Sequence, residues 1–245
     1  MLERLVRSIL PHSARRHLLP NYLLSRDVAW EGKALFRHYA GARKCRVHFA
    51  NKTQLQVQIG CGNRRQDGWE NLDLQRLAGV WTWDCRRGLP FADNSVSVIF
   101  SEHVFEHLDR PRSSAPFLAE CLRCLEPGGI IRLVVPDAEL YLRAYMSRSW
   151  DEMVKARPLV PENGGYNDAW LGERYTTRME MVNAVFRQES EHKFAYDAET
   201  LMLDLRNAGF ADVIRQEYGK SLSSTRMPDS PERASESLYV EGRKG

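Results

Sequence analysis

The stretch that decides the predicted fold is residues 54–62, QLQVQIGCG. From Gln54 to Ile59 polar and apolar side chains alternate, which is the period-two pattern of a strand. Gly60-Cys61-Gly62 follows directly. Two glycines at the end of a strand predict a turn where a ligand can approach the backbone and meet N–H groups.

Short apolar runs and helical stretches continue this rhythm along the chain. Further strands are predicted at 69–74, 80–83, 95–100, 130–135, 213–218 and 237–241. Helices are predicted at 113–125, ended by Pro127-Gly128-Gly129, and at 198–208, ended by Gly209. This alternation predicts an α/β fold with a doubly wound, seven-stranded, mostly parallel sheet of Rossmann-like type and an antiparallel C-terminal hairpin.

The 245 residues suit one domain with a sizeable insertion. We expect a basic, partly helical extension at 1–50 and the main domain at 51–245, with a substrate-side insertion at about 138–195. Residues 1–50 hold ten Lys or Arg against three Asp or Glu. A solvated helical face explains this charge, and the alternative is a peripheral contact with a membrane surface of anionic lipid, with nucleic acid or with an acidic substrate.

Composition narrows the class of protein. Hydrophobic residues make up 43% of the chain and charged residues 27%, which is typical of a globular protein. No apolar run approaches the roughly 18 residues that a membrane-spanning helix needs. Five cysteines without framework spacing indicate a reducing compartment, so the expected location is cytoplasmic.

Acidic residues follow the second and third predicted strands, where ligands bind in open α/β sheets. Asp73 can accept both hydroxyls of a ribose, and Asp84 is placed for an adenine amino group. The third glycine of a dinucleotide fingerprint is missing, because Arg65 occupies its position. A phosphate-binding loop is also missing from the sequence. These features favour a nucleoside without phosphates, of which S-adenosylmethionine is the common one.

The same stretches resemble the class I S-adenosylmethionine-dependent methyltransferases, and most of all the bacterial type-11 methyltransferase domains. The resemblance rests on IGCGNRRQDGWENLDL, WDCRRGLPFADNSVSVIFSEHVFEHL, LAECLRCLEPGGIIRLVVPD and LRNAGF. It implies S-adenosylmethionine as the cofactor, bound by Gly60, Cys61, Gly62, Asp73, Leu74, Asp84, Cys85, Ser101 and Glu102. Ser97 departs from the pattern, since relatives often have aspartate there.

His103, Glu106 and His107 also spell H-x-x-E-H, an arrangement found in one group of zinc peptidases. That chemistry needs a long helix and a further carboxylate ligand, whereas this motif directly follows a predicted buried strand and Pro111 comes soon after. The sequence therefore favours a wall of the active site, and it gives no reason to expect a metal.

Methyl transfer to a hydroxyl requires a base, and histidine is the usual one near neutral pH. His103, closest to the end of the fourth strand, and His192, in the insertion, are the candidate catalytic residues. His107, Asp137 and Tyr196 are the candidates for contact with the substrate.

The predicted function is methyl transfer to an oxygen or nitrogen of a small-molecule or glycan acceptor. One alternative is transfer of another group of the cofactor, such as its aminocarboxypropyl chain. Nucleic-acid methylation is disfavoured because SEHV, and no N-P-P-Y-like motif, follows the fourth strand. A cofactor-binding scaffold without activity is a further alternative, and the sequence does not indicate an oligomeric state.

Overall fold

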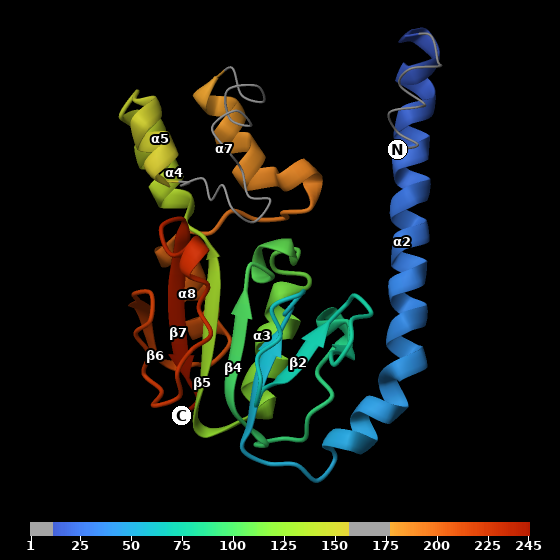
Figure 1. The fold of residues 1–245 in the computed structure, drawn as a ribbon, viewed down its shortest axis with the longest axis vertical. Coiled ribbons are helices and arrows are strands. Elements are labelled where there is room, and N and C mark those ends of the chain that lie inside the picture. The colour runs from blue at the N-terminus through green and yellow to red at the C-terminus, as the bar shows by residue number, and fades with distance from the viewer. Residues whose placement is uncertain (1–11, 157–176) are drawn as a thin grey trace.

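A seven-stranded sheet in the order β3-β2-β1-β4-β5-β7-β6 organises the protein (Figure 1). The computed structural model describes residues 12–156 and 177–245. The strands are β1 (Leu55–Ile59), β2 (Glu70–Asp73), β3 (Trp81–Thr82), β4 (Val96–Glu102), β5 (Leu125–Pro136), β6 (Ala211–Gln216) and β7 (Ser237–Arg243). The first five strands are parallel to one another, and β7 lies antiparallel between β5 and β6. The predicted α/β class and C-terminal hairpin are confirmed.

The central strands are covered on both faces, which explains their nearly continuous apolar sequence. Val57 and Ile59 of β1, and Val96 and Ile99 of β4, belong to one large buried cluster. The helices α3 (Ser114–Cys124) and α8 (Ala198–Asn207) contribute to the same cluster through residues such as Leu118. This core holds the ends of β1 and β4 in fixed positions.

The Cys121-x-x-Cys124 pair lies in α3, where both side chains are fully buried and both thiols are free. Burial raises the pKa of Cys124 to about 12. A thiol with such a pKa stays protonated near neutral pH, and only a thiolate reacts in redox exchange. The pair therefore serves packing.

Strand β5 begins at Leu125, five residues before the predicted start at Ile130. Its early part contains Gly128 and Gly129, which we expected only to end the preceding helix. A Cβ at Gly129 would lie 2.8 Å from the carbonyl oxygen of Glu126, so glycine allows the backbone to continue into the sheet here. The register shift of β4 against β5 falls beside this segment, between Val96 and Val98.

The described part of the N-terminal region, for which we expected partial helix, forms one helix, α2 (His12–Phe49). Figure 1 shows it running along one side of the molecule and extending beyond the sheet. Cys45 and Phe49, near its end, are buried in the main core. Apolar side chains earlier in the helix are exposed, including Trp30, Phe36 and Tyr39. Residues 1–11 of the predicted extension lie outside the described part.

The insertion forms a separate small core above the carboxyl ends of the strands (Figure 1). Helices α4 (Ala138–Met146), α5 (Trp150–Ala156) and α7 (Arg178–Arg187) contribute Tyr141, Met153, Met181, Val182 and Val185 to it. The short helices η1 (Cys85–Arg87), η2 (Phe105–His107), η4 (Gln188–Ser190) and η5 (Pro231–Arg233) lie in loops. Residues 157–176 of the insertion lie outside the described part.

Arg132 of β5 is a fully buried cation that joins the C-terminal half of the sheet. Its Nε and Nη2 donate to the two carboxylate oxygens of Asp229 at 2.8 and 2.6 Å, and its Nη1 donates to Glu241 at 2.9 Å. The carbonyls of Lys220 and Glu217 accept the two remaining N–H groups. All five donors of the guanidinium are thus used.

We predict that Arg132→Met lowers the free energy of unfolding by about 3–5 kcal/mol, because Asp229 and Glu241 lose the cation that compensates their buried charge. Urea denaturation measures this change. The matched control is Arg215→Met, which removes a half-exposed guanidinium paired with Asp137 and should change the free energy by less than about 1 kcal/mol. Equal losses for the two variants would contradict the account.

Candidate cofactor and acceptor site

The candidate site lies where β1, β2 and β4 end side by side. Ile59 of β1 is in register with Leu72 of β2 on one side and with Ser101 of β4 on the other. β1 lies between β2 and β4, so the direction in which the chain adds strands to the sheet reverses at β1. This is the switch point at which open α/β sheets bind ligands.

Asp73, the last residue of β2, fixes the loops that follow two strands. One carboxylate oxygen accepts the N–H of Gly62 at 2.8 Å, and the other accepts the N–H of Gln75 at 2.7 Å. Each carboxylate oxygen has about two acceptor positions, so each keeps one for a further donor. Two hydroxyls on adjacent carbons, as in a ribose, match this remaining capacity.

The glycine turn after β1 has the backbone that its sequence predicts. Gly60 and Gly62 both have positive φ, 72° and 51°, a region that residues with a Cβ rarely adopt. A Cβ at Gly60 would lie 2.1 Å from Cγ2 of Val104, so the turn packs closely against the loop after β4. A Cβ at Gly62 would meet no atom within 4 Å, so there is space beside that backbone. Cys61 between them is buried.

Asp84 lies at the end of β3 as expected, but its carboxylate is already engaged. It accepts four hydrogen bonds, from the N–H, Nε and Nη2 of Arg86 and from Nε of Arg87. Arg86 also pairs with Glu31 of α2, which links the N-terminal helix to this carboxylate. In this arrangement Asp84 has no position left for an adenine amino group. Leu74 directly follows Asp73 and Cys85 directly follows Asp84, and both side chains are half-buried.

The loop after β4 starts with a buried polar group. Ser101 is 1% exposed, and its Oγ has no hydrogen-bond partner among the residues that the structure describes. Such a group indicates a place for an additional polar partner. Glu102, by contrast, accepts hydrogen bonds from the N–H and the hydroxyl of Ser230, and Arg64 donates to the same hydroxyl.

His103 turns the chain away from β4. Its φ is 53°, and its N–H donates to the carbonyl of Val134 at 2.8 Å. The ring lies between two partners: Nε2 is 2.9 Å from the hydroxyl of Ser237, and Nδ1 is 3.7 Å from Oε1 of Glu106. The side chain remains 13% exposed.

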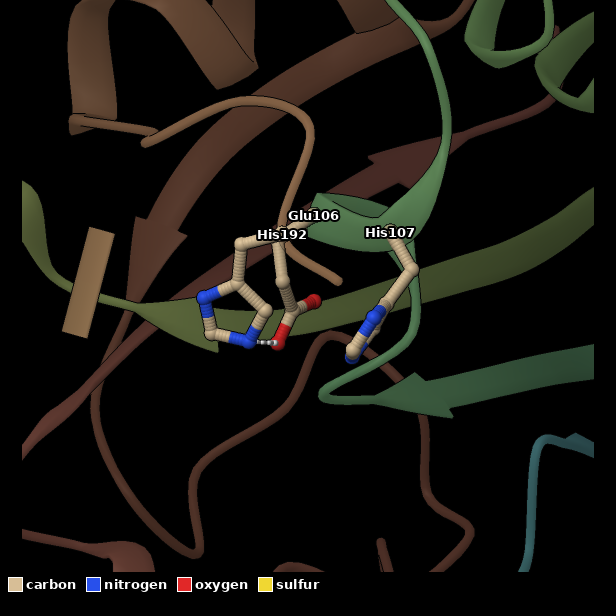
Figure 2. Close-up of side chains that lie close together, drawn as sticks. All are labelled: Glu106, His107 and His192. Carbon is tan, nitrogen blue, oxygen red and sulfur yellow. Dashed lines mark ion pairs between the residues drawn. The ribbon is translucent and has the colours of Figure 1, made fainter. Parts of the chain in front are cut away.

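Glu106, His107 and His192 lie close together (Figure 2), although His192 comes from the insertion. The ring centroids of His107 and His192 are 4.7 Å apart, and Nε2 of His192 is 3.9 Å from Oε1 of Glu106. Burial raises the pKa of Glu106 to about 8 and lowers the pKa of His107. Glu106 was not predicted as a site residue, although its position within the H-x-x-E-H motif could have indicated it.

Tyr196 and Asp137, two of the predicted substrate residues, are held in place by neighbouring groups of the protein. Tyr196 is fully buried, and its ring packs against those of Phe105 and Phe194. Asp137 caps α4 through the N–H of Leu140 and pairs with Arg215. Both side chains are therefore part of the framework that holds the insertion on the sheet, and Tyr196 also lines a small cavity together with Glu106 and His192.

The residues present fit S-adenosylmethionine at three points: the space beside Gly62, the remaining acceptor positions of Asp73 and the buried hydroxyl of Ser101. Asp84 is the point that does not fit, because Arg86 and Arg87 occupy its acceptor positions. The methionine and ribose ends of the cofactor thus have more support here than its adenine end.

Residues 80–133 match a family model described as a methyltransferase domain. The match covers the loop after β3, all of β4 and α3, and most of β5. Together with the strand order of the sheet, this match supports the predicted class, an S-adenosylmethionine-dependent methyltransferase of class I with S-adenosylmethionine as the cofactor. A comparison with curated protein sequences gave no significant match.

Solved structures of similar fold include S-adenosylmethionine-dependent methyltransferases. One from Archaeoglobus fulgidus is 16% identical, with a TM-score of 0.46, 86% of this chain covered and 94% of the other. One from Mesorhizobium loti is 18% identical, with a TM-score of 0.42 and coverages of 82% and 96%. Phosphoethanolamine N-methyltransferase 2 of Haemonchus contortus, solved with S-adenosyl-L-methionine, is 13% identical, with a TM-score of 0.40 and coverages of 69% and 35%.

We predict that Gly60→Ala destabilises the protein more than Gly68→Ala does. Both glycines have positive φ, which costs a residue with a Cβ about 1–2 kcal/mol, but only Gly60 also collides with Val104. The overlap should add about 1–3 kcal/mol to the loss in the free energy of unfolding, measured in urea. The double variant Gly60→Ala, Val104→Ala should lose the overlap contribution. Similar effects at positions 60 and 68 would show that the turn is not packed as described.

Proposed function

We propose that the protein transfers a methyl group from S-adenosylmethionine to an oxygen or nitrogen of a small-molecule or glycan acceptor. The observation that carries the proposal is Asp73, a carboxylate oriented by two backbone N–H groups at the switch point of the sheet. Gly60 and Gly62 would line the methionine portion, Asp73 would hold the ribose, and Ser101 would contribute its buried hydroxyl.

When bound, S-adenosylmethionine supplies a methyl carbon on a positively charged sulfur, so the electrophile comes with the cofactor. The protein has to place the acceptor atom in line with that carbon, and such positioning supplies a large part of the rate. The loop after β4 is suited to this task because the close packing of Val104 on Gly60 and the bond from His103 to Val134 hold it in place.

For a hydroxyl acceptor we propose His103 as the base. Its ring lies at the end of β4, it is partly exposed, and its orientation is set by Ser237 on one side and Glu106 on the other. His192 is less suited to this role, since only 5% of its side chain is exposed and Nδ1 donates to the carbonyl of Val185. We therefore propose that His192, like His107, holds the site in shape.

The acceptor class rests on the family resemblance and on the insertion. Helices α4, α5 and α7 lie above the strand ends, where an acceptor has to enter (Figure 1). None of the described helices is long and apolar enough to cross a membrane. The five cysteines, all in the described part, are free thiols, which supports the expected cytoplasmic location. Transfer of an aminocarboxypropyl group remains the alternative reaction at the same cofactor site.

We predict that Asp73→Asn weakens the binding of S-adenosylmethionine about 10- to 100-fold, because hydrogen bonds to a charged acceptor are worth about 1.5–3 kcal/mol. Calorimetric titration measures this. The control is Asp67→Asn, in the loop between β1 and β2, whose side chain is 97% exposed and which should change the affinity less than twofold. Undiminished binding by the folded Asp73→Asn protein would rule out the proposed role of this carboxylate.

The transferred group is identified by the mass of the product. Incubation with S-adenosylmethionine and a panel of hydroxylated and amino-bearing saccharides and metabolites should give a product heavier by one methyl group, with S-adenosylhomocysteine released. Release of methylthioadenosine with a larger mass gain would instead assign aminocarboxypropyl transfer. His103→Gln should lower kcat for a hydroxyl acceptor about 10²–10⁴-fold while binding of the cofactor is retained.

A further inference from the structure

We propose that Glu106, His107 and His192 form a binding site for a divalent transition metal, with zinc as the ion to test first. One ring nitrogen from each histidine and one carboxylate oxygen lie within 4.8 Å of one another (Figure 2). Imidazole and carboxylate together are a donor set that suits zinc and its first-row neighbours. The inference does not depend on the methyl-transfer reaction, although Glu106 also lies beside His103, the proposed base.

The distances allow the three donors to meet at one ion. Tetrahedral zinc with bonds of about 2.0–2.1 Å places neighbouring donor atoms about 3.3 Å apart. Nε2 of His192 and Oε1 of Glu106 are already 3.9 Å apart. Since all three donor atoms lie within 4.8 Å of one another, changes in side-chain torsions that bring them closer by at most about 1.5 Å would place the set at bonding distance.

Both histidines have a second contact that prepares them as ligands. Nδ1 of His192 lies 2.6 Å from the carbonyl oxygen of Val185, and Nδ1 of His107 lies 3.2 Å from that of Glu191. A carbonyl only accepts, so each Nδ1 carries the proton and each neutral ring has its lone pair on Nε2. Histidines that bind metals almost always donate their other N–H to such a partner.

Glu106 is the observation that points to a ligand. It is 1% exposed, and neither of its carboxylate oxygens accepts a hydrogen bond from any residue in the described ranges. Buried carboxylates in proteins are paired, protonated or bound to metal, since an isolated one is very costly. Nδ1 of His103 and Nε2 of His192 lie 3.7 and 3.9 Å from Oε1, beyond hydrogen-bonding distance, so a cation between Glu106, His107 and His192 would compensate the carboxylate and the two ring lone pairs together.

The backbone around the cluster is held rigidly, as a metal site requires. The carbonyl of Glu106 accepts the N–H groups of Lys193 and Phe194 at 2.7 and 3.2 Å. These bonds join η2 to the segment that carries His192. A metal here would link the insertion to the loop after β4, because His192 and Glu106 are 86 positions apart in the chain.

The site differs from that of a zinc peptidase with an H-x-x-E-H helix. In those enzymes the two histidines of the motif bind the metal and the glutamate acts on a water. Here η2 is a single short turn, His103 has a left-handed φ and its Nε2 contacts Ser237. Glu106 is instead a ligand, beside His107 and the distant His192. Three protein ligands leave one position for water or an acceptor atom.

The test is calorimetric titration of untagged protein, first treated with a chelator, with Zn²⁺ and, in parallel, with Co²⁺. We expect one ion per chain and a cobalt spectrum typical of nitrogen and oxygen ligands. Zinc at about 100 times its Kd should raise the Tm by about 5–10 °C. Mg²⁺, which prefers oxygen ligands, should not compete.

Glu106→Gln is the decisive variant, because it keeps the shape of the side chain and removes the buried charge, so the protein should fold. It should weaken zinc binding at least 100-fold and abolish the rise in Tm. His107→Gln and His192→Gln should weaken binding similarly, whereas the control His48→Gln, a histidine of α2 beside Lys52 and Glu70, should bind as wild type does.

The proposal is overturned if the wild type binds neither zinc nor cobalt at one ion per chain. It is equally overturned if folded Glu106→Gln binds zinc with unchanged affinity, because the ion would then lie elsewhere. Binding of S-adenosylmethionine is measured on the same samples. Loss of the metal site and loss of the cofactor site are thus observed separately, and the two proposals can fail independently.

Discussion

The carboxylate of Asp73 joins the loops after β1 and β2 by accepting the N–H groups of Gly62 and Gln75. The geometry of the whole site depends on these two bonds. They hold the glycine turn in its left-handed conformation, and the turn in turn packs against Val104 of the loop after β4. One side chain therefore relates three strand ends to each other, and it still has acceptor positions for a ligand.

Much of this arrangement could be predicted from local sequence. The alternation of Gln54 to Ile59, the two glycines and the acid after β2 are local patterns with a direct physical meaning, and the structure has them where they were expected. The α/β class and the closing hairpin follow from the rhythm of strands and helices, whereas the strand order comes from the structure. Short-range patterns of this kind predict structure best within a single strand or turn.

Other features depend on contacts that no local pattern contains. The position of Asp84 at a strand end was predictable, but Arg86 and Arg87 fold back onto it, and Glu31 of α2 completes the network. Tyr196 was expected to share the pocket wall with His192, but its packing against the rings of Phe105 and Phe194 was not predicted. The extent of α2 was underestimated because its apolar residues do not form one continuous stripe.

The H-x-x-E-H motif is a further case in which local sequence did not predict the contacts of its residues. Its three polar residues were recognised at once, but the motif alone could not reveal that His103 contacts Ser237 while Glu106 and His107 meet His192. That assignment needs the path of the insertion, which returns to the strand ends and pairs its backbone with Glu106. The motif thus contributes His103 to the end of β4, and Glu106 and His107 to the cluster with His192.

The central claim is that the switch point around Asp73 is where S-adenosylmethionine binds. A crystal structure of the protein grown with S-adenosylhomocysteine tests it most directly. The account predicts electron density with the two ribose hydroxyls on the carboxylate of Asp73, the amino-acid portion along Gly60 and Gly62, and the sulfur facing the loop from Ser101 to His103. Density for the nucleoside at any other edge of the sheet would contradict the account.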